Sequence, residues 1–133
     1  MSADYIRKQR DEWLRQSDYD LETAKVMYDT GRYIYCVFMC HLSLEKALKG
    51  IYLENTGEVA PKVHNLLYLI EKTGIKLTDD WYQFLFQLNN ASLPTRYPQS
   101  LENAIKEFGK TKTIDVLDKT TKIQTWIKSQ LKK

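Results

Sequence analysis

The sequence predicts an all-α protein: an up-and-down four-helix bundle with an additional short helix and a Pro-bracketed loop. Apolar residues recur at helical spacing along most of the 133 residues. No stretch alternates apolar and polar residues between hairpin turns, which is the pattern of paired strands. The connections between the helical segments are short, as in antiparallel bundles. A chain of this length is expected to form one domain spanning residues 1–133.

Two long helices are predicted first. One runs from about Tyr5 to Thr30, where Gly31 suits a helix end, and the other from about Arg32 to Asn55. The apolar stripe of the first comprises Trp13, Leu14, Leu21, Ala24 and Met27 or Tyr28. The second carries two adjacent apolar seams, too wide for one neighbour to cover. It is therefore expected either to lie at the centre of the bundle or to be shared with a second subunit.

The remaining helices are shorter or more weakly patterned. They are predicted at residues 64–72, 78–92, 101–109 and 113–132. Between the helices predicted at residues 78–92 and 101–109, Pro94 and Pro98 are expected to hold the chain extended, because proline disfavours helix at its own position and before it. Such a loop would fix the directions of Arg96 and Tyr97.

Composition excludes several classes of protein. The net charge of +3 gives no global attraction to nucleic acid, although residues 101–133 hold eight lysines against four acids. That basic tail is either a solvated helix face or a phosphate-facing surface. Cys36 and Cys40 lie on one helix face, a poor geometry for a disulfide, so a reducing, cytoplasmic setting is expected. No apolar run of about 20 residues predicts a membrane span, and no metal or cofactor site is predicted.

Two polar residues interrupt the apolar seam of the second helix. His41 and Glu45 are four residues apart and so face the same way, and buried polar groups need partners. His41 could donate to Glu45, and Arg96 could supply a further partner. One interpretation is a buried tie that holds the 94–98 loop to the bundle; the other is a pocket that meets phosphate or a base. His64 is expected to open the third helix, and helix N-termini favour anions.

No familiar enzyme motif occurs elsewhere in the sequence. Walker loops, GxSxG elbows and HExxH helices are missing from the 133 residues. The nine tyrosines could stack on bases, but at helical spacing most are expected at the edge of the core.

Three stretches in order resemble the HEPN family, the higher eukaryotes and prokaryotes nucleotide-binding domains. They are FMCHLSLEKALK at residues 38–49, PKVHNL at residues 61–66, and RYP at residues 96–98. These match the family's E-K-A-L-K helix, its H-[DN]-L helix start and its R-Y-P loop, over about Trp13 to Pro98. The resemblance implies a four- or five-helix bundle that forms a homodimer. It also implies a small nucleotidyltransferase as possible partner, in two-gene modules that can act as toxin and antitoxin.

Many HEPN proteins are metal-independent endoribonucleases with an Arg, four to six residues and then a His. In this sequence the residues after Arg96 at that distance are Leu101, Glu102 and Asn103, so the motif is missing. We therefore expect a protein that binds a nucleotide, RNA or a partner protein, with no catalytic residue assigned. The candidate binding residues are His41, Glu45, Lys49, His64, Arg96 and Tyr97. The alternative is a metal-independent endoribonuclease with a non-standard site built from His41, His64 and Arg96.

Overall fold

The computed structural model describes residues 1–132, and within them all regular structure is helical. The helices are α1 (Ala3–Asp29), α2 (Tyr33–Thr56), α3 (Leu66–Thr73), α4 (Asp79–Arg96), α5 (Leu101–Glu107) and α6 (Lys110–Ser129). The prediction of an all-α bundle is confirmed. No helix in the described part of the chain is both long enough and apolar enough to span a membrane.

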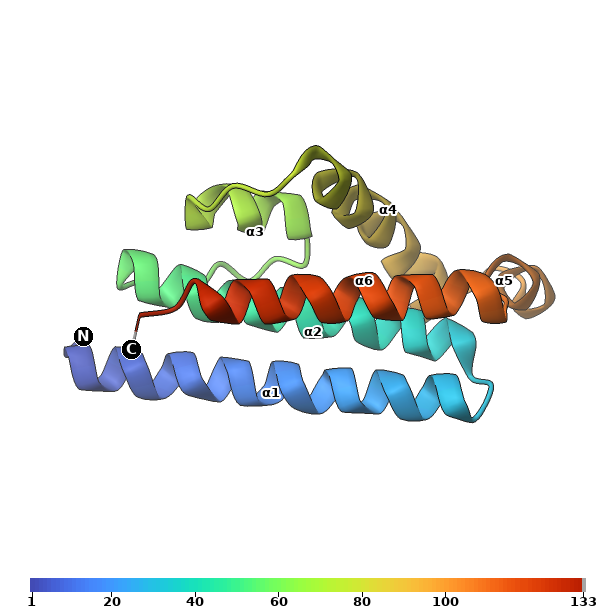
Figure 1. The fold of residues 1–133 in the computed structure, drawn as a ribbon, viewed down its shortest axis with the longest axis horizontal. Coiled ribbons are helices and arrows are strands. Elements are labelled where there is room, and N and C mark those ends of the chain that lie inside the picture. Colours follow the sequence, from blue (N-terminus) through green and yellow to red (C-terminus); the bar gives the residue numbers. More distant parts are fainter. Residues whose placement is uncertain (133) are drawn as a thin grey trace.

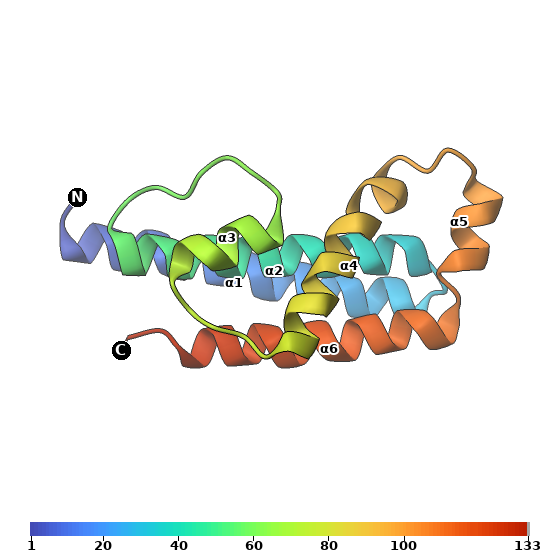
Figure 2. The ribbon, with the colours of Figure 1, turned by 90° about the horizontal axis from the view of Figure 1, so that it is seen from above.

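The bundle is organised around α2, which contacts each of the other five helices. α1 and α2 form an antiparallel hairpin, and α6 lies alongside both of them (Figure 1). α3 and α4 cover another side of α2, where α4 crosses obliquely, and α5 sits at one end (Figure 2). Of the two arrangements expected for the second helix, the structure has the central one. Its wide apolar surface is covered mostly by its own chain.

Most helix boundaries follow from capping chemistry. Side-chain oxygens of Ser2, Asn65, Thr78 and Ser100 accept hydrogen bonds from the first turns of α1, α3, α4 and α5. The starts and ends of α1, α2 and α3 lie within two residues of prediction. α6 begins three residues earlier than predicted, at Lys110. Gly109 precedes it in an extended conformation and offers no side-chain cap, so the sequence carries no signal for this start.

The prediction of an extended segment from Pro94 to Pro98 is wrong in its first half. α4 continues through Pro94 and ends at Arg96. Pro94 lies in the last turn, where its missing N–H removes only one helical hydrogen bond. The hydroxyl of Thr95 donates to the carbonyls of Ala91 and Ser92, which stabilises that turn. Arg96 is therefore positioned by a helix, and the loop to α5 is short.

α1 and α2 pack unusually closely near the middle of the hairpin. A Cβ atom added at Gly50 would lie 3.2 Å from Leu14 Cδ2 and 3.2 Å from Trp13 Cβ. Farther along, the hydroxyls of Ser17 and Ser43 each donate to the other residue's carbonyl, at 2.7 and 2.8 Å. These buried polar groups are fully paired, so the contact fixes the register of the two helices without an unpaired donor.

A narrow stripe of α2 stays partly open between α1 and α4. Tyr35 is exposed, while Phe38, Met39 and Leu42 are half-buried. The two cysteines of α2 are fully buried, as expected of small apolar side chains, and a hydrogen bond to Cys36 together with burial raises the pKa of Cys40. The open stripe is the part of α2 that a second molecule could reach.

Candidate functional site

Glu45 is the centre of a buried polar cluster on α2. Its carboxylate lies 3.0 Å from His64 Nδ1 and 3.1 Å from Lys49 Nζ, and its side chain is only 5% exposed. A carboxylate has no proton to give at neutral pH, so both neighbours must be donors. His64 therefore carries its proton on Nδ1. Its Nε2 is left as an acceptor on a side chain that is 66% exposed.

His41 does not form the predicted hydrogen bond to Glu45. Its Nδ1 is 3.9 Å from Glu45 Oε1, beyond hydrogen-bond distance, and has no other partner among the described residues. Its Nε2 lies 3.3 Å from Asn89 Oδ1 instead. Because Asn89 presents an oxygen, the neutral His41 ring must be protonated at Nε2, so its Nδ1 lone pair faces the Glu45 carboxylate.

Asn89 of α4 ties this cluster to the start of α3. Its Oδ1 also accepts from the backbone N–H of Leu66 at 2.9 Å, and its Nδ2 donates to Asn65 Oδ1 at 2.8 Å. That Asn65 oxygen is the N-cap of α3. The three contacts determine which way the Asn89 amide points. Through them α4 fixes the ring of His41 and the position at which the chain enters α3 next to His64.

Arg96 lies on the same side of α2 but pairs with no acid in the described part of the chain. Its guanidinium carbon is 4.5 Å from the ring centroid of Phe38, and its Nε is buried without a hydrogen-bond acceptor. None of the ion pairs formed within residues 1–132 includes Arg96. Arg96 was expected to pair with Glu45, and the structure gives it an aromatic partner instead. Its positive charge remains uncompensated.

The cluster is electropositive as a whole. With the histidines counted as neutral, Glu45 contributes one negative charge, and Lys49 and Arg96 contribute two positive charges. Burial lowers the pKa of His41; the nearby Glu45 carboxylate raises it, though by less than burial lowers it. Within residues 1–132, no group of three or more metal-ligating side chains lies together. The positive charges of Lys49 and Arg96 suit anion binding, and the exposed imidazole of His64 suits proton transfer.

An open hollow adjoins the exposed side of His64. It has a volume of about 400 Å³ and lies between the start of α3 and one face of α4. Its lining comprises His64, Asn65, Leu67, Phe86, Asn89, Asn90 and Ser92. Phe86 is 56% exposed, which is unusual for a phenylalanine. The hollow thus combines an imidazole acceptor, side-chain amides and an exposed aromatic ring.

Five of the six candidate residues come together, and one does not. His41, Lys49 and His64 surround Glu45, and Arg96 is near enough for its charge to lower the pKa of His41. Tyr97 is 69% exposed and lines a separate hollow beside α5. Sequence reasoning missed Asn89. A signal was present, because asparagine is a poor helix former and Asn89 follows directly on the apolar helical pattern that ends with Leu88.

The family model described as HEPN domain matches residues 11–130, nearly the whole chain. The chain belongs to the HEPN family. Two solved structures share the fold of this HEPN domain. TT1696 from Thermus thermophilus has 26% identity and a TM-score of 0.81, with 92% of this chain and 98% of that chain covered. ST0689, described as an archaeal HEPN homologue, has 24% identity and a TM-score of 0.75, with 93% and 98% covered. No curated protein matches the sequence.

The three motifs that suggested the HEPN family meet in space. The E-K-A-L-K helix supplies Glu45 and Lys49, the H-[DN]-L segment supplies His64 and Asn65, and the R-Y-P segment supplies Arg96. The positions at which the ribonuclease histidine is expected fall on α5, where Leu101, Glu102 and Asn103 are all exposed. In this HEPN domain, α5 brings no histidine to the cluster.

Proposed function

We propose that this HEPN domain is a binding and interaction protein whose polar cluster takes a phosphate group of a nucleotide or of RNA. The phosphate meets the Arg96 guanidinium and the exposed edge of His64, and a base packs in the adjoining hollow against Phe86. Phosphate contacts by arginine, combined with base stacking on an aromatic ring, are a common way to bind single-stranded nucleic acid.

The unpaired charge of Arg96 carries this proposal. A partly buried guanidinium normally has a carboxylate partner, because an uncompensated charge is costly to remove from water. Within residues 1–132, Arg96 packs against the Phe38 ring and forms no ion pair, and its Nε lacks an acceptor. A bound phosphate would supply the missing negative charge and would accept from the terminal N–H groups of the guanidinium.

Binding of a fluorescent single-stranded RNA and of ATP to the Arg96→Ala variant tests the proposal. We expect a loss of about tenfold or more in affinity, since a charge-assisted contact contributes about 1.5–3 kcal/mol. Arg32→Ala is the matched control, because Arg32 is exposed and forms no ion pair within residues 1–132. Thermal melting checks that both variants fold. Equal affinities for wild type and Arg96→Ala would contradict the proposal.

We further propose that the interaction partners include a second copy of the chain. The partly open stripe of α2 would present Tyr35, Phe38, Met39 and Leu42 to a second copy. Arg96 lies at the edge of this stripe, against Phe38. A small nucleotidyltransferase remains a proposed partner on family resemblance alone. Sedimentation of the wild type beside Leu42→Glu distinguishes a homodimer through this stripe from a monomer.

An endoribonuclease activity is the second candidate function, because Glu45 and His64 form a paired carboxylate and imidazole. Glu45 accepts a hydrogen bond from the Nδ1–H of His64, so the Nε2 of this exposed side chain is free to accept the proton of a ribose 2′-hydroxyl. The same 2′-oxygen would attack the neighbouring phosphorus while the bond from phosphorus to the 5′-oxygen of the next nucleotide breaks, which leaves a 2′,3′-cyclic phosphate. The leaving 5′-oxygen would take a proton from water, and Arg96 would stabilise the added charge on the phosphate oxygens.

Incubation of the protein with single-stranded RNA and excess chelator tests this second function. Cleavage is expected to stop in His64→Ala and to fall in Arg96→Ala. Cleavage that survives His41→Ala, His64→Ala and Arg96→Ala tested separately would indicate a contaminating nuclease. Binding without cleavage would leave the interaction protein as the function.

A further inference from the structure

One ring nitrogen inside the polar cluster is buried without a partner. His41 is 1% exposed, and its Nδ1 forms no hydrogen bond within residues 1–132. The other ring nitrogen, Nε2, is bonded to Asn89, so the ring cannot turn to pair Nδ1 elsewhere without losing that contact. Nδ1 lies 3.9 Å from Glu45 Oε1. A lone pair that faces a carboxylate is repelled by it, whereas an N–H at the same place would be attracted.

The surroundings of His41 therefore favour and oppose a second ring proton at the same time. With a proton on each nitrogen, the ring would present Nδ1–H to Glu45 and would still donate from Nε2 to Asn89. Burial opposes this state and lowers the pKa of His41, and the positive charge of Arg96 lowers it further. Burial is fixed by the fold. The charge of Arg96 is not fixed, because this side chain packs on an aromatic ring and has no acid beside it in the described part of the chain.

The other charged or titratable groups around His41 have defined roles. Glu45, on the same helix, raises the pKa of His41, and Lys49 is the ion-pair partner of that carboxylate. His64, from the segment before α3, lowers the pKa of His41 to a smaller extent than Arg96 of α4 does. Among these groups Arg96 is the cation whose charge an incoming anion would cancel.

We propose that the polar cluster binds its anion together with a proton, which Nδ1 of His41 takes up from solvent. This inference rests on the proposed function, in which a phosphate meets Arg96. The phosphate removes the positive charge that opposes the proton, and the proton then pairs with Glu45. Because linkage between two binding equilibria is reciprocal, the proton in turn favours the anion. Affinity for the anion should therefore rise as the pH falls from 8 to 6.

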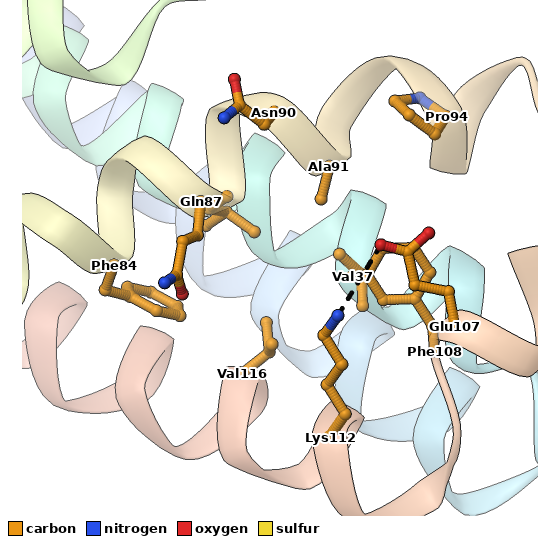
Figure 3. Close-up of a pocket in the computed structure, with 11 residues that line it drawn as sticks. Val37, Phe84, Gln87, Asn90, Ala91, Pro94, Glu107, Phe108, Lys112 and Val116 are labelled. Atoms are coloured by element: carbon orange, nitrogen blue, oxygen red, sulfur yellow. Dashed lines mark ion pairs between the residues drawn. The ribbon is translucent and has the colours of Figure 1, made fainter.

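Removing the charge of Arg96 imitates the bound anion without a ligand. In an NMR titration of the His41 ring, the pKa should be higher in Arg96→Gln than in wild type. Lys112→Gln is the matched control, because it removes one positive charge that is already paired. Lys112 reaches across the groove between α4 and α6 toward Glu107, with Nζ 3.7 Å from Oε1 (Figure 3). An equal His41 pKa in wild type and Arg96→Gln, or an equal rise in both variants, would overturn the coupling.

Calorimetric titration with a single-stranded RNA that lacks terminal phosphates measures the coupling directly. Terminal phosphates are left out because they titrate at about pH 6 themselves. At pH 6, in buffers of different ionisation enthalpy, wild type should take up more protons per RNA bound than His41→Gln. The wild-type affinity should rise about fivefold from pH 8 to pH 6, and that ratio should be smaller in His41→Gln. Glutamine suits the comparison because its amide can still donate to Asn89.

The pH ratio separates a proton acceptor from a residue that only shapes the site. Loss of a shaping residue would change the affinity by the same factor at both pH values and leave the proton uptake as in wild type. That result would overturn the coupling and leave the proposed function standing. A wild type that binds no RNA at either pH would overturn the proposed function and this inference with it. If thermal melting shows that His41→Gln does not fold, the Arg96→Gln titration decides alone.

Discussion

Replacing Glu45 by glutamine should destabilise the domain strongly. The side chains of Glu45 and Lys49 are only 5% and 8% exposed, and their charged atoms are 3.1 Å apart. Glutamine keeps the shape but removes the negative charge, so the Lys49 ammonium is left buried without a counter-charge. Breaking a buried pair in this way costs about 3 kcal/mol. With an unfolding entropy of roughly 2.1 cal/mol/K per residue, that loss lowers Tm by about 10 °C in a chain of 133 residues.

Urea denaturation followed by far-UV circular dichroism measures this loss. Glu58→Gln is the matched control, because Glu58 is exposed and in no ion pair within residues 1–132, so its stability should change by less than about 0.5 kcal/mol. The double change Glu45→Gln with Lys49→Met should recover much of the loss, since no buried charge is then left unpaired. A loss below about 1 kcal/mol in Glu45→Gln would refute the reasoning, because it would mean that the pair is solvated.

Two further predictions concern packing and pH. Gly50→Ala should destabilise the domain by about 1–3 kcal/mol despite the better helix propensity of alanine, because the close α1–α2 contact cannot open without strain. Gly109→Ala, where a Cβ meets nothing within 4 Å, should cost less in urea denaturation, because it loses only the N-cap preference of glycine over alanine. Burial lowers the pKa of His41 below the usual 6.5, so the unfolded chain takes up its proton first as the pH falls. Stability should therefore hold above about pH 6.5 and decline below it, and His41→Gln should flatten that part of the pH profile.

The helices could be predicted from the sequence because apolar spacing and capping residues are local signals. The exceptions have physical causes. Pro94 is read as a helix breaker, yet one missing hydrogen bond in a last turn is tolerated when the Thr95 hydroxyl bonds neighbouring carbonyls. Gly109 gives no side-chain cap, so the start of α6 carries no sequence signal.

Several residues of the cluster could be predicted from the sequence, but their pairing could not. His41 and Glu45 were identifiable as polar side chains on an apolar seam, and His64 and Arg96 as neighbours through the family motifs. The sequence does not show where the segment between α2 and α3 lies, and that segment brings His64, rather than His41, to the Glu45 carboxylate. Asn89 was missed because its role depends on the crossing of α4 over α2 and on the entry to α3.

The short connection between α1 and α2 has a consequence for the order of folding. Only residues 30–32 separate the two helices, and the bond between Ser17 and Ser43 closes a loop of 26 residues, whereas the bond between Gln124 and Ser17 spans 107. Loop closure costs more entropy as the loop lengthens, so the α1–α2 hairpin should assemble first and α6 should dock late. Until α6 docks, one apolar side of α2 faces water. A nascent chain is most exposed to aggregation during that interval.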